Sequence, residues 1–344
     1  MNYEKTKEYL VKNRKTWLVT GVAGFIGSNL AEQLLRLGQK VVALDNFITG
    51  HRYNLEHIKN SVTSDEWKKF HFFEGDINDL QFCQMITKNI DIVLHQAALG
   101  SVPRSIDDPI TSHTSNATGF LNVLSAAKEN GVKRFVYASS SSVYGDSQEL
   151  PKVEHKTGNL LSPYAVTKMV DELYGGVFHK TYAMQTVGLR YFNVFGKRQD
   201  PNGAYAAVMP KWIAQILHGE DVYINGDGET SRDFTYIENV VQMNILAGTT
   251  TNEKAYGEAF NTAAGGRETL NNLYSAISEG LQKQLKGLKP KEPIYREFRV
   301  GDIRHSNADI SKAKEILEYE PTHTLEEGLS ESLAWYINDI QGSK

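Results

Sequence analysis

Short apolar runs recur along the first half of the chain, and amphipathic stretches of helical period separate them. Between the runs, Ser28–Leu37 and Thr118–Glu129 place apolar residues three and four apart, as on one face of a helix. Strand-like runs that alternate with helix-like stretches are typical of βαβ units, which build parallel sheets. We therefore predict an α/β fold with a Rossmann-like, doubly wound parallel sheet. Its strands are expected at Thr16–Thr20, Val41–Asp45, His71–Glu74, Ile92–His95, Phe135–Ser139 and Thr186–Arg190.

The pattern changes after Asn193. Loops rich in glycine, proline and asparagine follow, with short helices and brief strands between them, which predicts a smaller, mixed α/β C-terminal lobe. The stretch Arg232–Ala247 again resembles a strand followed by a helix, so we expect the chain to return to the first sheet. The first domain is then predicted to cover residues 1–193 with a return near 232–262, and the second lobe 194–231 and 263–344. The charged segment after Leu281 is predicted to be solvated linker and helix surface.

The composition narrows the class of protein. Hydrophobic residues make up 40% of the 344 positions and the formal net charge is -4, as in ordinary globular proteins, so we expect no nucleic-acid partner. The single cysteine, Cys83, excludes a disulfide framework and a zinc site of several thiolates, and the histidines lack ligand spacing, so no metal is expected. Residues 1–15 lack a signal-peptide core and no apolar run is long enough to span a bilayer, which favours a cytoplasmic protein without a membrane partner.

A glycine motif follows the first predicted strand directly. In Gly21-Val-Ala-Gly24-Phe-Ile-Gly27, the first glycine permits a tight turn, the second a close approach to a pyrophosphate, and the third close packing of the next helix on the sheet. A glycine triplet alone also suits a plain turn. Asp45 ends the second strand, where its carboxylate can accept hydrogen bonds from the adenosine ribose and would repel a 2′-phosphate, so NAD is favoured over NADP. Asp76, after the third strand, suits an adenine contact or an ordinary loop carboxylate.

A helix start carries two candidate acid/base groups. In Ser162-Pro163-Tyr164-Ala-Val-Thr-Lys168, the serine can cap a helix and the proline suits its first position, so Tyr164 and Lys168 share one face. A phenol titrates near pH ~10, and the positive charges of Lys168 and of an oxidised nicotinamide would let it act as a base at neutral pH. The alternative is an ordinary helix pair with no catalytic role.

Four serines, Ser139–Ser142, follow the strand that begins at Phe135. Hydroxyls at the carboxyl end of a strand face the crevice in which such sheets bind ligands. We expect the hydroxyl of Ser140, assisted by those of Ser141 and Ser142, to bridge a substrate hydroxyl and the Tyr164 oxygen. Some of these hydroxyls also suit a turn that caps the next segment.

From about Lys15 to its C-terminus the sequence resembles the extended short-chain dehydrogenases/reductases, and among them the UDP-hexose 4-epimerase group. The glycine triplet, Asp45-Asn46, Leu94-His-Gln-Ala-Ala98, the serine run, the Tyr164/Lys168 pair, Arg190-Tyr-Phe-Asn193 and Gly226-Asp-Gly-Glu-Thr-Ser-Arg-Asp233 occur in that group's order. The resemblance implies bound NAD. The residues expected around NAD are Gly21, Gly24, Phe25, Ile26, Gly27, Asp45, Asn46, Thr49, Gly50, Asp76, Ile77, Gln96, Ala97, Ala98, Asn116, Tyr164, Lys168 and Tyr191.

The resemblance also implies a reaction and a substrate. Related sugar dehydratases and decarboxylases carry an acid beside the catalytic hydroxyl, whereas Ser139–Ser142 contain none, which leaves reversible oxidation at C4 of a UDP-sugar. Arg232 and Arg299 occur where the group holds the diphosphate, and Asp302 where it holds the uridine ribose. The residues expected around the UDP-sugar are Gly100, Ser101, Ser140, Ser141, Tyr164, Asn193, Ala207, Val208, Lys211, Tyr223, Asn225, Arg232, Arg267, Arg299, Asp302 and Ser306.

Ser306 narrows the choice of sugar. Where epimerases restricted to non-acetylated hexoses carry a tyrosine, this small side chain leaves room for a 2-acetamido group, as in the bacterial surface-polysaccharide enzymes that interconvert UDP-N-acetylglucosamine and UDP-N-acetylgalactosamine. Epimerisation of a UDP-N-acetylhexosaminuronic acid stays open, since Arg104 or Lys211 could meet a carboxylate, and so does a catalytically silent sensor that binds NAD or a UDP-sugar. The resemblance further implies a homodimer, paired through Thr118–Glu129 and Tyr164–His179.

Overall fold

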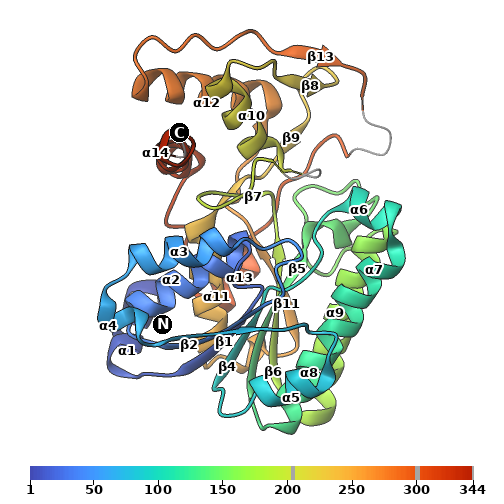
Figure 1. Cartoon of the computed structure of the whole chain (residues 1–344). Coiled ribbons are helices and arrows are strands. Elements are labelled where there is room, and N and C mark those ends of the chain that lie inside the picture. The colour runs from blue at the N-terminus through green and yellow to red at the C-terminus, as the bar shows by residue number, and fades with distance from the viewer. Residues whose placement is uncertain (203–205, 299–302, 343–344) are drawn as a thin grey trace.

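A single parallel sheet of seven strands organises the computed structural model, which describes residues 1–202, 206–298 and 303–342 (Figure 1). The strand order is β11-β6-β5-β4-β1-β2-β3, so the chain reverses direction across the sheet between β1 and β4. The predicted doubly wound α/β fold is confirmed, and the six strands predicted with bounds end within one residue of the observed ones, whereas β11 was expected only as part of the return near 232–262. The strands are β1 Thr16–Thr20, β2 Lys40–Asp45, β3 Phe70–Glu74, β4 Ile92–His95, β5 Arg134–Ser140, β6 Gln185–Tyr191 and β11 Glu258–Thr262.

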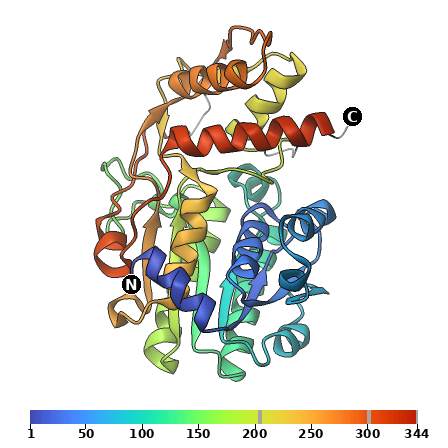
Figure 2. The ribbon, with the colours of Figure 1, turned by 90° about the vertical axis from the view of Figure 1, so that its left-hand side faces the viewer.

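Helices cover both faces of the sheet because successive side chains of each strand point to opposite faces and both sets are apolar (Figures 1 and 2). Trp17 and Val19 pack in one buried cluster, whereas Leu18 between them belongs to the cluster on the other face. The first face carries α1 Tyr3–Lys12, α2 Phe25–Arg36, α3 Arg52–Ser61, α4 Ser64–Trp67 and α11 Ile237–Thr249. The second face carries α5 Leu80–Ile86, α8 Gly119–Glu129 and α9 Pro163–Tyr182.

The chain leaves the sheet after β6 and returns to it at the edge. In its described part, the excursion contains α10 Val208–His218, four short strands and α11. The chain then runs through the 3₁₀ turn η3 Glu253–Ala255 into β11, which pairs in parallel with β6 from Glu258 opposite Val187. The short strands β7 Val194–Phe195 and β10 Thr235–Tyr236 pair with each other at the start and end of the excursion. Residues far apart in sequence therefore meet at the carboxyl end of β6.

A smaller lobe lies beyond the end of the sheet from which β6 leads into β7 (Figures 1 and 2). Three helices contact one another there, and two short strand pairs, β8 with β13 and β9 with β12, complete it. The elements are α10 Val208–His218, α12 Leu270–Gln284, α14 Leu325–Gly342, β8 Tyr223–Asn225, β9 Ser231–Arg232, β12 Glu268–Thr269 and β13 Ile294–Arg296.

One sequence expectation needs correction, and the helix α1 was not predicted. The segment after Leu281 is not simply solvated, since Leu329, Leu333 and Tyr336 of α14 are buried in the core that the sheet and the lobe share. Residues 1–15 also contain an unpredicted helix, α1, whose Leu10 is buried and accepts a hydrogen bond from Gln39 through its carbonyl oxygen (2.7 Å). Within the described part of the chain, no helix is both long and apolar enough to cross a membrane. The remaining elements are α6 Val102–Asp107, α7 Pro109–His113, the π-helix η1 Thr114–Thr118, the 3₁₀ turn η2 Ser141–Tyr144 and α13 Ser311–Leu317.

Candidate active site

The glycine motif forms the turn between β1 and α2. Gly21 has a φ of +69° and its N–H donates to the carbonyl of Leu44 (2.8 Å), which ties the turn to the neighbouring strand. A Cβ at Gly27 would lie 2.2 Å from the Gly21 carbonyl oxygen, so α2 can pack this close to the turn only with glycine there. The N-cap of α2 is Gly24, which has no side chain to cap the helix, so the first N–H groups of α2 are available to an anion.

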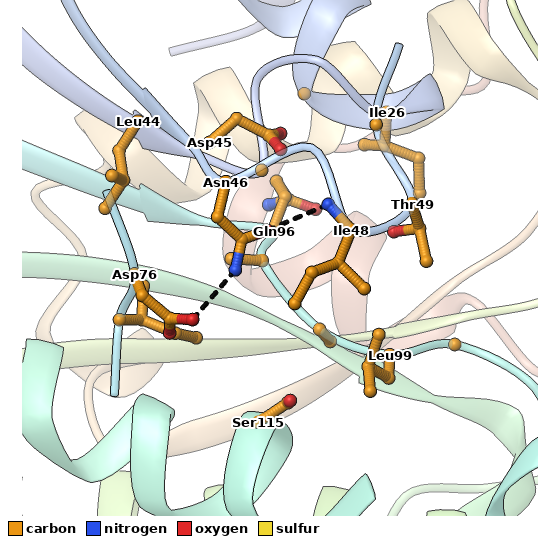
Figure 3. Close-up of a pocket in the computed structure, with 18 of the residues that line it drawn as sticks. Ile26, Leu44, Asp45, Asn46, Ile48, Thr49, Asp76, Gln96, Leu99 and Ser115 are labelled. Carbon is orange, nitrogen blue, oxygen red and sulfur yellow. Dashed lines mark hydrogen bonds between the residues drawn. The ribbon is translucent and has the colours of Figure 1, made fainter. Parts of the chain in front are cut away.

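A cavity of about 310 Å³ opens beside this turn, at the carboxyl ends of β1, β2, β3 and β4 (Figure 3). This is the place where parallel α/β sheets bind ligands. Residues predicted around NAD that line it are Gly21, Gly24, Phe25, Ile26, Gly27, Asp45, Asn46, Thr49, Gly50, Asp76, Ile77, Gln96, Ala97 and Ala98. Gly100, predicted near the sugar, lines it too. The sequence reasoning missed Leu44, Ile48, Gly75, Leu99 and Ser115, which all adjoin or lie close in sequence to predicted residues.

Asp45 is held in place by backbone groups. One carboxylate oxygen accepts from the N–H of Ala23 and the other from the N–H of Phe47, each at 2.8 Å. Burial raises the pKa of Asp45 above its usual value, and the backbone donors oppose that rise by favouring the charged form. The carboxylate is thereby fixed at the cavity wall with lone pairs left to accept further hydrogen bonds.

The loop after β2 is linked to the loop after β3. The Asn46 side-chain amide donates to Asp76 (3.0 Å), and its carbonyl oxygen accepts from the N–H of Ile48 (3.1 Å), as the dashed lines in Figure 3 show. The two polar residues therefore face each other across one end of the cavity. This end of the cavity is therefore formed by two loops that a side-chain hydrogen bond joins, and not by a helix or strand.

Asn116 supports the cavity from behind and does not line it. Its side chain accepts from the N–H of Leu99 (2.7 Å) and donates to the Leu99 carbonyl (3.1 Å) and to Thr167 Oγ1 (3.2 Å). The amide is buried in the π-helix η1, and its neighbour Ser115 reaches the cavity instead. Asn116 therefore fastens the chain after β4 to α9, which carries Tyr164.

The predicted helix start at Ser162 is observed. Ser162 Oγ accepts from the N–H of Ala165 (3.1 Å), Pro163 is the first helical residue, and the Tyr164 N–H donates to Ser105 Oγ of α6 (3.0 Å). Lys168 lies one turn further and is buried. Its Nζ donates to the carbonyl of Ala138 on β5 (2.9 Å) and to Asp171 Oδ2 (3.2 Å).

The four serines after β5 have different surroundings. Ser139 Oγ donates to Glu172, a partly buried carboxylate that Arg190 also binds, and so this hydroxyl points away from the cavity. Ser140 Oγ caps η2 by accepting from the N–H of Ser142 (3.1 Å). Ser142 Oγ is buried and has no hydrogen-bond partner among the described residues, so it is free to bind a ligand. Ser141 is partly exposed beside it.

Tyr191, which does not line the cavity either, ends β6 within a buried hydrogen-bond network. Its phenol donates to Gln96 Oε1 and accepts from the Asn244 side chain, both at 2.9 Å, while Gln96 donates to Asn244 Oδ1 (3.0 Å). Burial raises the pKa of Tyr191, which keeps the phenol neutral. Asn244 lies on α11 and was not predicted, because no local motif indicates that this helix packs against β4.

A second, more polar cavity lies in the smaller lobe. Predicted substrate residues that line it are Asn193, Val208, Lys211, Tyr223, Asn225 and Arg232. The sequence reasoning missed Ala206, Trp212, Gln215, Thr230, Phe234, Leu270 and Arg296, several of which come from segments far apart in sequence. The Arg296 guanidinium stacks 3.3 Å from the centre of the Tyr223 ring, because β13 pairs with β8. Ala207 occupies the N-cap position of α10 and does not line this cavity.

Ser231 forms hydrogen bonds with two further predicted substrate residues, Arg267 and Ser306. Its hydroxyl accepts from Arg267 Nε (2.7 Å) and contacts His305 Nδ1 (2.8 Å), and its carbonyl accepts from the N–H of Ser306 (3.0 Å). Ser101, in contrast, lies at the start of α6 with a φ of +118°, and its hydroxyl accepts from the Arg104 N–H (3.3 Å). Arg299 and Asp302 lie outside the described residues. Within the described ranges, no group of three or more His, Cys, Asp or Glu side chains could hold a metal ion.

Comparison with known proteins agrees with this geometry. The profile of the NAD dependent epimerase/dehydratase family matches residues 17–263. The UDP-glucose 4-epimerase of Mycolicibacterium smegmatis is 34% identical over 94% of this chain and 99% of its own length, and the UDP-glucuronate 4-epimerase of Thermodesulfobacterium geofontis is 35% identical over 94% and 97%. The structure of a UDP-N-acetylglucosamine 4-epimerase from Methanobrevibacter ruminantium M1, in complex with UDP-N-acetylmuramic acid, is 37% identical with a TM-score of 0.85 and covers 95% of this chain and 99% of its own. The chain therefore belongs to the NAD dependent epimerase/dehydratase family, and within it to the UDP-sugar 4-epimerases.

Proposed function

We propose that this enzyme interconverts UDP-N-acetylglucosamine and UDP-N-acetylgalactosamine through a 4-keto sugar. The observation that carries the sugar assignment is Ser306, a small side chain whose backbone is tied to Ser231 in the lobe that contains the second cavity. A small side chain leaves space for an acetamido group, which a tyrosine would fill. The likeness to the Methanobrevibacter ruminantium UDP-N-acetylglucosamine 4-epimerase supports the same assignment.

The cavity beside the glycine turn fits NAD. The uncapped N-terminus of α2 suits the pyrophosphate, and the fixed Asp45 carboxylate suits the ribose hydroxyls. NAD would supply an acceptor for the hydride of C4, and in its reduced form the donor that returns this hydride to the other face of the keto sugar. We assign the remaining cofactor contacts to the predicted residues at the cavity wall, with Asn116 and Tyr191 holding that wall from behind.

The chain's own residues would handle the proton. Tyr164 Oη takes the proton of the 4-hydroxyl group, and the ammonium of Lys168 stabilises the phenolate that this step requires. The unpartnered Ser142 hydroxyl, with Ser140 and Ser141, orients the 4-oxygen toward Tyr164. After the keto sugar has turned its other face inward, Tyr164 returns the proton to the product.

Proton NMR of UDP-N-acetylglucosamine mixed with purified protein tests this function, with no NAD added. We expect UDP-N-acetylgalactosamine to form, and Tyr164→Phe to slow its formation by about 100-fold or more. Tyr174→Phe is the matched control, since Tyr174 lies on the same helix in contact with Phe178, and it should leave the rate unchanged. No product from protein that retains NAD would instead indicate a sensor.

Ser306→Tyr tests the sugar assignment. Turnover of UDP-N-acetylglucosamine should fall by at least tenfold while that of UDP-glucose does not fall, because only the acetamido group needs the space. Equal losses on both sugars would show that Ser306 does not border the 2-substituent.

One observation keeps a carboxylated sugar as a second candidate. Lys211 lines the second cavity, and its side-chain ammonium makes no hydrogen bond or ion pair with any described residue, so it could bind the carboxylate of a UDP-N-acetylhexosaminuronic acid. The likeness to a UDP-glucuronate 4-epimerase is compatible with this. Lys211→Met should then raise the KM of the uronic acid far more than that of UDP-N-acetylglucosamine.

We also propose that the enzyme is a homodimer paired through α8 and α9. On α9, Val166, Leu173 and Val177 are 45%, 62% and 54% exposed and lie seven and four positions apart, so they form one apolar stripe. Ile106 and Ile110, on the adjacent α6 and α7, are also exposed. Such a stripe is typical of an interface, and Leu173→Glu should convert a dimer to a monomer in light scattering after size exclusion.

A further inference from the structure

The buried carboxylate of Asp171 lies on the same face of α9 as Tyr164 and Lys168, the two side chains on which the proposed proton transfer depends. Tyr164, Lys168 and Asp171 occupy positions i, i+4 and i+7 of α9 and therefore share one face of the helix. The Asp171 side chain is 0% exposed and Lys168 is 3% exposed, with 3.2 Å between Oδ2 and Nζ. The other carboxylate oxygen, Oδ1, is buried and accepts no hydrogen bond from any described residue.

This pair has few neighbours that could stabilise it. Glu172, the next residue on α9, is bound by Arg190 of β6 and by Ser139 of β5, so it forms a separate ion pair. The other titratable groups that face the pair are the buried phenol of Tyr137 on β5 and the buried imidazole of His95 on β4. Burial raises the pKa of Asp171 and Glu172 adds to that rise, whereas Lys168 lowers it.

An ion pair without further partners contributes little to stability, because the cost of removing both charges from water offsets their attraction. Asp171 does change the electrostatic potential that Lys168 produces around it. A carboxylate at 3.2 Å offsets part of the positive potential that the Lys168 ammonium exerts on neighbouring groups. It also holds Nζ where it can donate to the Ala138 carbonyl at the end of β5.

Epimerisation makes two opposite demands on Tyr164. Its phenolate must first take a proton from the sugar hydroxyl, and the resulting phenol must then return a proton to the same oxygen. A strong uncompensated positive charge would favour the first step and hinder the second, because it would stabilise the phenolate too much. A reversible reaction therefore needs an ammonium whose influence is moderated.

We propose that Asp171 is a positioning residue of the Tyr164 site: its carboxylate holds Lys168 against β5 and offsets the ammonium charge, so that Tyr164 can return the proton it has taken. This proposal rests on the proposed role of Tyr164 in epimerisation. No atom of Asp171 needs to contact the sugar for it to have this effect.

Asp171→Asn tests the proposal, because it keeps the shape and an acceptor for Lys168 while removing the charge. Without that negative charge the phenolate forms more readily, so the acid limb of the kcat pH profile should move to lower pH by about one unit, with KM changed less than twofold. The matched control is Asp65→Asn. Asp65 also pairs with a lysine three positions away, Lys68 at 2.8 Å, but on the surface and far from the sheet's carboxyl edge, so its profile should match the wild type.

The outcomes separate this inference from the function on which it rests. An acid limb that stays in place in Asp171→Asn overturns the inference, including the case in which only the melting temperature changes. If Asp171→Asn does not fold, Asp171→Ser removes the same charge from a smaller side chain and should show the same shift. Full activity in Tyr164→Phe would instead reject the proposed function, whatever the two Asp171 variants show.

Discussion

Gly27→Ala should have two opposite effects on stability, a gain in helix propensity and a steric clash, and the structure allows their sizes to be compared. Gly27 lies in the first turn of α2, and alanine is favoured over glycine inside a helix by about 0.5–1 kcal/mol. The added Cβ, however, would lie 2.2 Å from the Gly21 carbonyl oxygen and 2.8 Å from its carbonyl carbon. These are backbone atoms of the glycine turn that we propose to hold NAD, so the turn itself must shift by about 1 Å to make room. Overpacking of this kind costs about 1–3 kcal/mol.

We therefore expect Gly27→Ala to lower the free energy of unfolding by about 1–2 kcal/mol, since the steric cost exceeds the helix gain. The shifted turn should also lose one or two charge-assisted hydrogen bonds to the pyrophosphate, and NAD should bind about 10- to 100-fold more weakly. Urea unfolding measures the first quantity, and calorimetric titration of NAD into cofactor-free protein measures the second.

Two other glycines calibrate the result. A Cβ at Gly176, on α9, would lie 3.5 Å from its nearest neighbour, the Gly257 carbonyl oxygen, so Gly176→Ala should be neutral or slightly stabilising and should leave NAD affinity unchanged. Gly24→Ala, with 3.2 Å to the Gly21 carbonyl oxygen, should fall between the two. Wild-type stability and NAD affinity in Gly27→Ala would refute this account of the turn.

Three further predictions concern buried polar groups. Lys168→Met leaves the Asp171 carboxylate buried without its cation and should cost about 3–5 kcal/mol in urea unfolding, most of which the double variant with Asp171→Asn should recover; no recovery would mean that the two side chains are not coupled. Burial raises the pKa of Asp233 to about 6 from 3.8, so the folded state binds this proton more tightly, and the resulting stability is fully present below pH ~4 and lost as the pH rises through about 6. The stability of the wild type relative to Asp233→Asn should accordingly fall by about 2 kcal/mol between pH 4 and pH 7, and a constant difference would contradict the shift. Asn116→Ala removes the acceptor of the buried Leu99 N–H and should cost about 1–3 kcal/mol in thermal or urea unfolding, whereas an unchanged value would show that water replaces the amide.

Local sequence was sufficient for the parts of the site that one short segment builds. The glycine turn, Asp45 at the end of β2, and the start of α9 at Ser162 depend on backbone conformation and on contacts between residues a few positions apart. Turn and cap chemistry is set by such neighbours, which is why spacing alone located these groups. The alternation of apolar runs likewise determined the sheet, because strands buried on both faces need continuous apolar side chains.

Tertiary structure decided which side chains from different segments contact one another. Asn244 of α11 reaches Gln96 and Tyr191 only because the chain returns to the sheet, and Arg296 stacks on Tyr223 only because β13 pairs with β8. In the serine run, the neighbours from other elements and not the sequence direct one hydroxyl toward Glu172 and leave another without a partner. Such contacts join residues many positions apart, so no local period or spacing encodes them. Sequence thus determined which chemical groups the site contains, and packing determined which of those groups remain free to act.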